Sequence, residues 1–266
     1  MSSLVEAAFE RRAERARLLA REAVAAREPL RFAAGLYQVQ GRLAAAIAAL
    51  HDTRRALTGR LTDDLAGLVE ASFELLGFAA ENGPVGLAGA ARDRSREAEA
   101  VLGSRLVVFW GADRAKEPDY LSRALLRPYV EVLARLGIAP DRTLRTGRCP
   151  FCGGAPWIAA RRSAAEADGA SRSLGCALCG GEWPFARIRC ASCSEENPER
   201  LPSFASDTYP GARVEACETC RRYVKSIDLT LDGRAIPEVD DLVSLGMDLW
   251  ATREGFGRIE PGLAGF

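Results

Sequence analysis

The fold of this chain is decided by residues 148–222, which begin RCPFCGG, continue through CALCGG (176–181) and CASCSEE (190–196), and end CETCRR (217–222). All eight cysteines of the 266-residue chain lie here, in four Cys-x-x-Cys pairs: Cys149 with Cys152, Cys176 with Cys179, Cys190 with Cys193, and Cys217 with Cys220. The segments between successive pairs are 23, 10 and 23 residues long, which is typical of one unit repeated twice. Two tight Cys-x-x-Cys turns complete a tetrahedral four-cysteine metal site. The sequence therefore predicts two such sites.

The segment between the second and third pairs indicates how the pairs combine. Residues 180–189 include Trp183, Phe185 and Ile188, and this apolar content favours a strand that joins two modules over a ligand loop. We therefore favour a sequential arrangement, in which the first and second pairs hold one ion and the third and fourth pairs hold the other. A cross-braced arrangement, first with third and second with fourth, obeys the same ligand rules and stays open.

The residue after each pair indicates how relaxed each turn is. Gly153 and Gly180 follow the first two pairs, where a backbone with positive φ is often needed and glycine adopts it without strain. Ser194 and Arg221 occupy the equivalent positions after the third and fourth pairs. We therefore expect the second site to have the less relaxed turns and to be the weaker of the two.

Other uses of the cysteines fit the sequence less well. A disulfide framework needs an oxidising compartment, and the N-terminal residues MSSLVEAAFE contain no apolar run of the kind found in signal peptides. A dithiol redox site normally uses a single Cys-x-x-Cys, and an iron–sulfur cluster suits a hairpin with two such turns less well than one ion does. Four thiolates in a tetrahedron suit zinc and iron alike, so the ligands do not choose the metal.

Charge argues against a nucleic-acid-binding role. The chain is formally neutral, with +4 on residues 1–148, +1 on 149–227 and −5 on 228–266. Eight thiolates and two divalent ions would bring the middle segment to −3, whereas a nucleic-acid-binding ribbon normally presents a basic surface. A local basic patch is still compatible with the sequence, and its candidates are Arg187, Arg189, Arg221 and Arg222. No apolar stretch approaches the length of a membrane span.

The pattern along the chain predicts an α+β protein in four parts. Residues 1–147 form a helical domain, 148–189 and 190–232 are the first and second four-cysteine metal modules, and 233–266 are a C-terminal helix and tail. Helices are predicted at 4–27, 30–50, 62–81, 95–111 and 119–136, with a break at Glu28-Pro29, a cap at Thr62 and a stop at Gly137.

The region after residue 148 predicts short strands, because apolar and polar residues alternate between turn signals. The strands are expected at 155–160, 171–175, 201–206, 212–216 and 223–231. A helix then begins at Pro237, has acidic residues in its first turn, and ends at Gly255. Modules this small bury little apolar surface, so metal binding is expected to supply their stability.

The whole pattern resembles the formate dehydrogenase accessory protein family (FdhE-type). The resemblance is strongest from Cys149 to Arg258. Beyond the four pairs, it is carried by Trp183, Tyr223-Val224-Lys225, Asp240-Asp241-Leu242, Asp248 and Glu254-Gly-Phe-Gly-Arg258. The helical half matches only in length and general character.

The resemblance implies two rubredoxin-like modules behind a helical domain. It also implies a cytoplasmic maturation factor, not an enzyme, that acts as a chaperone on the catalytic subunit of respiratory formate dehydrogenase before export. Carried onto this chain, Cys149, Cys152, Cys176 and Cys179 would hold one ion, and Cys190, Cys193, Cys217 and Cys220 the other. The family favours iron, with zinc as the alternative. No stable membrane insertion and no nucleic-acid partner are expected, whereas self-association stays open.

Two other functions stay open at this point. An iron ion held by four thiolates can pass one electron, so the chain could be a rubredoxin-like electron-transfer or redox-sensing protein that acts on the same client. A nucleic-acid-binding zinc ribbon is the third hypothesis, which the charge distribution disfavours. The sequence identifies no catalytic residues and no client-binding surface.

Overall fold

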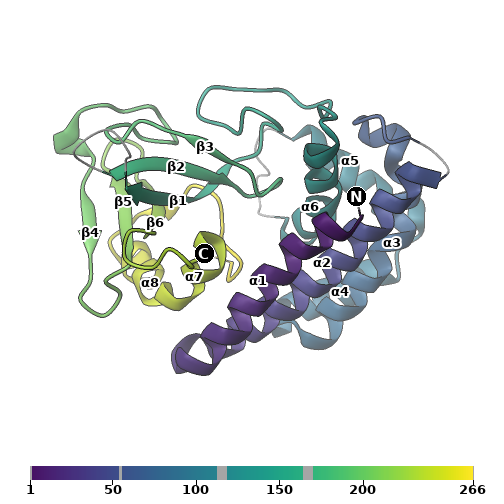
Figure 1. Ribbon diagram of the computed structural model, residues 1–266, viewed down its shortest axis with the longest axis horizontal. Helices are drawn as coiled ribbons and strands as arrows, with labels where there is room; N and C mark the ends of the chain where they lie inside the picture. The colour runs from purple at the N-terminus through teal and green to yellow at the C-terminus, as the bar shows by residue number, and fades with distance from the viewer. Residues whose placement is uncertain (1, 54–55, 113–118, 164–169, 266) are drawn as a thin grey trace. The chain divides into compact units, whose positions relative to one another are not determined.

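The computed structural model describes residues 2–53, 56–112, 119–163 and 170–265 (Figure 1). The chain divides into two compact units. The helical unit comprises residues 1–14 and 31–143, and the sheet unit comprises residues 15–30 and 144–266. Within the described residues, no helix combines the length and the apolar character that crossing a membrane requires.

The N-terminal half of the chain is helical, as predicted. Its helices are α1 (Ser2–Glu22), the short 3-10 helix η1 (Val24–Ala26), α2 (Arg27–Thr53), α3 (Leu61–Asn82), α4 (Val85–Ser95), α5 (Glu99–Gly111) and α6 (Tyr120–Leu136). The predicted break at Glu28-Pro29 is wrong, because the chain breaks at residues 23–26 instead. Pro29 lies in the first turn of α2, where a missing N–H costs no hydrogen bond.

Helix α6 is central to the helical unit, because every residue from Leu121 to Leu133 is buried. Gly137 ends it with φ = 69°, as predicted, and Pro128 lies inside it. The hydroxyl of Tyr129 donates to the carboxylate of Asp64 on α3 at 2.6 Å, and that carboxylate also accepts from the backbone of Thr58 and Gly59. A side chain from the first turn of α3 thus satisfies backbone donors that precede the helix.

Two helix predictions need correction. Thr62 does not cap α3, because the helix begins at Leu61 and its cap residue, Arg60, makes no side-chain cap bond. The segment predicted as one helix at 95–111 belongs to two, since α4 ends at Ser95 and α5 begins at Glu99. Helix α4 was not predicted; its positions 86 and 89 are glycines, which lower helix propensity and mask the pattern.

The sheet unit is built on a seven-stranded sheet in the order β3-β2-β1-β6-β5-β4, with β7 pairing β6. Its strands are β1 (Pro156–Ser163), β2 (Ala170–Cys176), β3 (Glu182–Pro184), β4 (Ser203–Ala205), β5 (Ala212–Cys217), β6 (Arg222–Asp228) and β7 (Gly257–Arg258). The predicted strands are present, although the joining segment 180–189 contains only the three residues of β3.

A parallel pairing joins the two cysteine modules into one sheet. Strand β1 of the first module pairs with β6 of the second, with Ile158 beside Lys225 and Arg161 beside Asp228. All the other pairings of β1, β2, β4 and β5 are antiparallel. The four-part division of the chain stays a prediction, and this shared sheet is the connection between its two middle parts.

The two faces of the sheet have different characters. One face carries Ile158, Val214 and Tyr223, which pack with Met247, Ala251 and Phe256 from the C-terminal segment. That segment consists of α7 (Pro237–Asp240), the 3-10 helix η3 (Asp241–Ser244), α8 (Leu245–Arg253) and the turn that follows it and carries Phe256. Figure 1 shows it beside the strands. The predicted single helix from Pro237 is therefore interrupted by η3, although Gly255 follows its end with φ = 79° as expected.

Residues 15–30 contact this C-terminal segment. The guanidinium of Arg15 donates to Asp240 at 3.0 Å and to Asp232 at 2.9 Å. Arg15 is only 11% exposed, and its pKa is raised mainly by the hydrogen bond to Asp240. The end of α1 is thus attached to the sheet unit by ion pairs.

Candidate metal centres

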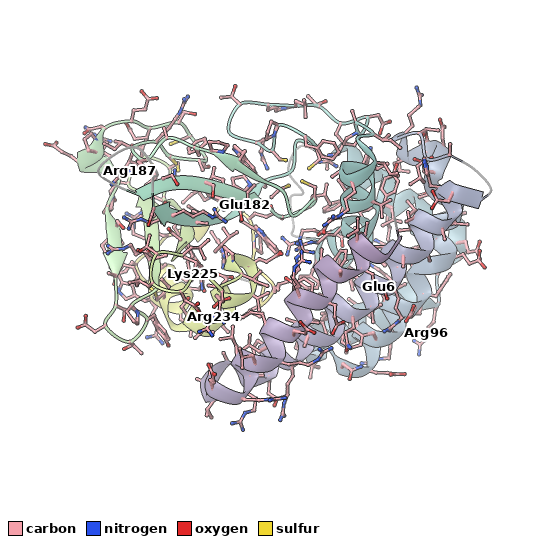
Figure 2. All side chains as sticks on the ribbon, viewed as in Figure 1. Glu6, Arg96, Glu182, Arg187, Lys225 and Arg234 are labelled. Atoms are coloured by element: carbon pink, nitrogen blue, oxygen red, sulfur yellow. The ribbon has the colours of Figure 1, made fainter. Side chains whose placement is uncertain are left out.

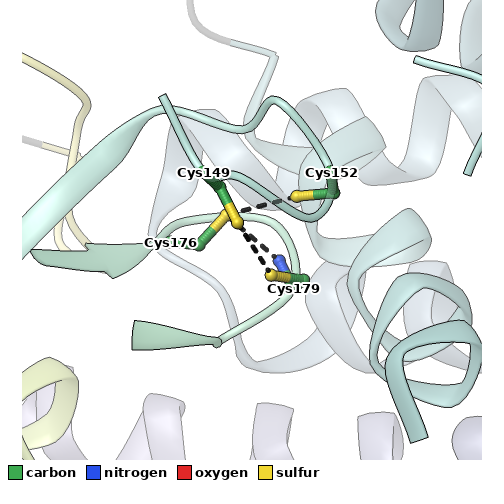
Figure 3. Close-up of side chains that lie close together, drawn as sticks. All are labelled: Cys149, Cys152, Cys176 and Cys179. Atoms are coloured by element: carbon green, nitrogen blue, oxygen red, sulfur yellow. Dashed lines mark hydrogen bonds between the residues drawn. The ribbon is translucent and has the colours of Figure 1, made fainter. Parts of the chain in front are cut away.

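The structure groups the eight cysteines as the sequential arrangement predicts. The sulfur atoms of Cys149, Cys152, Cys176 and Cys179 lie within 4.8 Å of one another, and so do those of Cys190, Cys193, Cys217 and Cys220. Figure 3 shows the first group. The first group contains only the first and second pairs, and the second group contains only the third and fourth pairs. The cross-braced alternative therefore does not describe this structure.

The first site is formed by two matching turns. One turn lies just before β1, and the other lies at the end of β2. The amide of Gly153 donates to the carbonyl of Cys149 at 2.9 Å, and the amide of Gly180 donates to that of Cys176 at 3.2 Å. The amides of Leu178 and Cys179 donate to the sulfur of Cys176 at 3.3 and 3.4 Å. Backbone donors aimed at sulfur stabilise a thiolate, which is the form that binds metal.

The sulfur separations fit a single ion in each site. In the first site Cys149 and Cys179 are 3.6 Å apart, and Cys152 and Cys176 are 3.4 Å apart. A tetrahedron with metal–sulfur bonds of about 2.3 Å places its sulfurs roughly 3.8 Å apart. A disulfide needs about 2.05 Å, and all eight cysteines are free. Each group could therefore hold one metal ion, which would be coordinatively saturated by its four thiolates.

The second site repeats the first with greater exposure. Its sulfur separations are 3.7 Å for Cys190 and Cys220, and 3.6 Å for Cys193 and Cys217. All four cysteines of the first site are buried, whereas Cys193 is exposed and Cys220 is half-buried. The second ion would lie closer to solvent and would be more accessible to chelators or to another protein.

The four residues that follow the pairs share one backbone conformation. Gly153 and Gly180 have φ of 66° and 65°, and Ser194 and Arg221 have φ of 64° and 54°. The last two are the only non-glycine residues with positive φ in the described part of the chain. The expectation that the second site has the more strained turns is confirmed, because the left-handed region is costly for residues with a Cβ. Whether this makes it the weaker metal site stays a prediction.

Proton loss must accompany metal binding at these sites. In the first site, three neighbouring thiols donate hydrogen bonds to Cys149 and hold its pKa well below the usual range, whereas burial raises the pKa of Cys176. Without metal, Cys149 is thus favoured as the thiolate, and the neighbouring cysteines of the first site keep their protons. An ion that binds all four sulfurs would displace those protons.

A buried network of charges supports the second module, and the sequence reasoning did not identify it. Lys225 points from β6 into the core face of the sheet and is 0% exposed. Its ammonium lies 2.5 Å from Asp248 and 2.9 Å from Asp241, and it donates to the carbonyls of Asp241 and Ser244. Lys225 is labelled in Figure 2.

Arg258 completes this network. Its guanidinium donates to Asp241 at 2.9 Å, to Asp248 at 3.2 Å and to the carbonyl of Trp157 at 2.8 Å. Two buried cations thus meet two buried carboxylates, which is the pairing that makes buried charge tolerable. The carbonyls of η3 face Lys225 instead of continuing an α-helix, and this explains the interruption of the predicted C-terminal helix.

Sequence spacing offered one signal for this network. Lys225 is one of only two lysines in the chain, and it lies between Tyr223 and Ile227 on the core face of β6. The four residues of the network (Lys225, Asp241, Asp248 and Arg258) and Tyr223 are among those that carry the resemblance noted in the sequence. Tyr223 donates to Asp248 at 2.7 Å. The motif of the tail therefore acts as a structural support for the sheet.

Fold and sites together define a protein with a helical region followed by a sheet built around two four-cysteine clusters. Residues 188–263 match the family model described as FdhE, C-terminal domain. The chain is 33% identical over 118 residues to a "Protein FdhE homolog" from Aquifex aeolicus, covering 44% of this chain and 41% of that protein. It is 34% identical over 119 residues to one from Pseudomonas aeruginosa, covering 43% and 38%. The resemblance to the FdhE-type family is confirmed.

A solved structure extends the likeness of fold to nearly the whole chain. The crystal structure of the FdhE protein from Pseudomonas aeruginosa superimposes with a TM-score of 0.71, covering 96% of this chain and 94% of that one at 22% identity. This similarity confirms the predicted α+β fold. The sequence matches span about two fifths of the length of the curated relatives.

Proposed function

We propose that this protein is a cytoplasmic accessory factor required for active respiratory formate dehydrogenase, and that it binds the catalytic subunit of that enzyme before export. The observation that carries the proposal is the FdhE-type C-terminal domain combined with two clusters of four cysteines. Four thiolates saturate a tetrahedral ion and leave no open position for substrate or water, so these sites suit a structural or electron-transfer role better than hydrolysis.

We assign each cluster one ion, with all eight cysteines as ligands. The resemblance to the family favours iron, and the same thiolates also suit zinc. Held by four thiolates, an iron ion supplies one-electron chemistry, whereas a zinc ion supplies none. The surrounding chain contributes the buried setting of the first site and the more exposed setting of the second.

A gene deletion tests the accessory function. We expect loss of formate dehydrogenase activity in the deletion strain, recovery with the wild-type gene, and no recovery with a Cys190→Ser, Cys193→Ser variant. Affinity purification of the tagged chain should recover the catalytic subunit. Unchanged formate dehydrogenase activity in the deletion strain would show that the chain is not required.

A redox role is the second candidate, and the exposure of Cys193 favours it, because electron transfer needs a short path from the ion to the surface. Protein produced anaerobically should contain about two metal ions per chain, as the two four-cysteine clusters imply. A reversible one-electron couple on iron-loaded protein would support this role, and a chain that holds only zinc would exclude it.

A further inference from the structure

The face of the sheet opposite the apolar core holds a cavity beside the second four-cysteine cluster. Its volume is about 270 Å³, and its walls come from β1, β2, β5, β6 and the segment that runs from the end of β3 to the start of β4. Six of its lining residues are arginines: Arg161, Arg172, Arg187, Arg189, Arg213 and Arg222. Glu215 is the only acidic side chain that lines it. Figure 2 labels Arg187, at the end of the sheet unit away from Lys225.

Strand register gathers these arginines. Arg161 on β1 lies directly opposite Arg172 on β2, and Arg213 and Glu215 alternate along β5 on the same face. Like charges directly opposite each other on neighbouring strands destabilise a sheet. Arg172 is compensated, because it forms an ion pair with Glu215 at 2.7 Å and donates to the carbonyl of Ala186 at 2.9 Å.

The remaining arginines retain unused hydrogen-bonding capacity. Among the described residues, Arg161, Arg187 and Arg213 have no ion pair or side-chain hydrogen bond, and Arg161 and Arg213 are half-buried. The Nε atom of Arg189 is buried and makes no hydrogen bond, and a carboxylate oxygen of Glu196 lies 3.5 Å from it. A half-buried guanidinium without a protein partner is only partly compensated, and an anion in the cavity would supply the acceptors that Arg161 and Arg213 lack.

Charge from the second metal site does not account for the arginines. Cys190 and Cys217 line the cavity, and four thiolates with a divalent ion carry a charge of about −2. Six arginines with Glu215 and with Glu196, which is paired to Arg189, give +4, so a surplus of about +2 is left after the charge of the metal site is subtracted. A single carboxylate cannot balance this surplus, whereas a diphosphate group carries three or four negative charges.

We propose that this cavity binds a small, multiply charged anion of the phosphate class, of the size of a diphosphate or a diphosphate-bearing metabolite. The planar guanidinium of arginine donates two parallel hydrogen bonds to phosphate oxygens. The volume of about 270 Å³ lies just below the usual range for small-ligand pockets, which suits a ligand as small as diphosphate. Arg161 and Arg213 supply the free donors, and Arg172, fixed by Glu215, forms a rigid wall.

Calorimetric titration of the metal-loaded, full-length chain with inorganic pyrophosphate tests this assignment. We expect one saturable site per chain, and binding at least tenfold weaker in both Arg161→Gln and Arg213→Gln, because each removes a charge-assisted hydrogen bond. Arg253→Gln is the matched control, since it makes the same charge change at an exposed position of the same unit outside the cavity. Circular dichroism and metal content establish that each variant is folded.

Two further titrations define the ligand class. Citrate, which has a similar charge carried by carboxylates, should bind at least tenfold more weakly than pyrophosphate, and citrate binding as tightly would overturn the phosphate assignment. A single-stranded RNA oligomer that binds more tightly than pyrophosphate at the same salt concentration would overturn the small-ligand assignment. Absence of saturable pyrophosphate binding, or equal weakening in Arg253→Gln, would refute the site itself.

Discussion

Replacing Lys225 by methionine tests the account of the buried charge network. The ammonium of Lys225 is 0% exposed and lies within 2.9 Å of carboxylate oxygens of Asp241 and Asp248. Methionine fills similar space without charge, so two buried carboxylates would share only Arg258. Removing one partner from a buried ion pair costs about 3–5 kcal/mol, because it leaves an uncompensated buried charge.

A second substitution separates charge balance from packing. Asp248→Asn in the Lys225→Met background leaves one buried cation, Arg258, with one buried carboxylate, Asp241. We therefore expect the double variant to be more stable than Lys225→Met alone, with a coupling of roughly 2 kcal/mol between the two sites. The exposed Arg234→Met variant is the control and should change the free energy of unfolding by less than about 0.5 kcal/mol.

Urea unfolding followed by tryptophan fluorescence measures these free energies, since Trp157 and Trp250 report on the sheet unit. The pH dependence gives an independent check. Burial alone raises the pKa of Asp241, but Arg258 and Lys225 outweigh it and lower that pKa. The stabilisation is therefore present above the unfolded pKa of the carboxyl and is lost as the pH falls through its lower folded value.

In Lys225→Met the pKa of Asp241 rises, so acid unfolding should begin at a higher pH than in the wild type. The reasoning would be refuted by a loss below about 1 kcal/mol in Lys225→Met, where 3–5 kcal/mol is expected. It would also be refuted if adding Asp248→Asn lowered the stability further by its full individual cost.

Three more predictions concern the metal sites. Ser194→Gly should stabilise metal-loaded protein by about 1 kcal/mol and slow metal loss to a chelator, because it relieves a left-handed backbone; Ser192→Gly in the same turn should not. Gly154→Ala would place a Cβ 2.6 Å from the sulfur of Cys176 and so disturb the first site. Metal analysis of this variant should therefore find about one ion per chain. Gly211→Ala, which has open space around it, is the control and should keep two ions. A strong chelator should abolish the β signal of residues 148–232 in circular dichroism while the helical signal persists, since metal ligation supplies much of their folding energy; an unchanged β signal would contradict this.

The sequence was sufficient to predict the features that depend on residues close together in the chain. Four Cys-x-x-Cys pairs with equal flanking gaps predict two four-cysteine clusters and favour their sequential grouping, which the structure shows. The positive φ of the residue after each pair follows from the geometry of the turn. Helix α6 and its stop at Gly137 were also predictable, because the apolar pattern and the stop signal agree. These features depend on neighbours within a few residues.

Features that depend on distant residues were not predictable in the same way. The parallel pairing of β1 with β6 joins residues 158–161 to 225–228, and neither strand alone indicates its partner. The interruption of the C-terminal helix at η3 depends on Lys225, which takes carbonyls that a regular helix would use. Four arginines were named from the sequence as candidates for a local basic patch. Three of them, Arg187, Arg189 and Arg222, line the cavity, whereas Arg221 lies over the ring of Phe256.

Strand β6 contributes side chains to both the cavity on one face of the sheet and the ion network on the other. Val224 faces the arginine-lined cavity, and its neighbour Lys225 faces the carboxylates of the core. Because side chains alternate along a strand, a shift of one residue in register would exchange these two environments. It would bury a valine among carboxylates and place a lysine among six arginines. The buried ion network therefore fixes the register of β6, and that register in turn places the arginines of β1 and β5 around one cavity beside the second metal site.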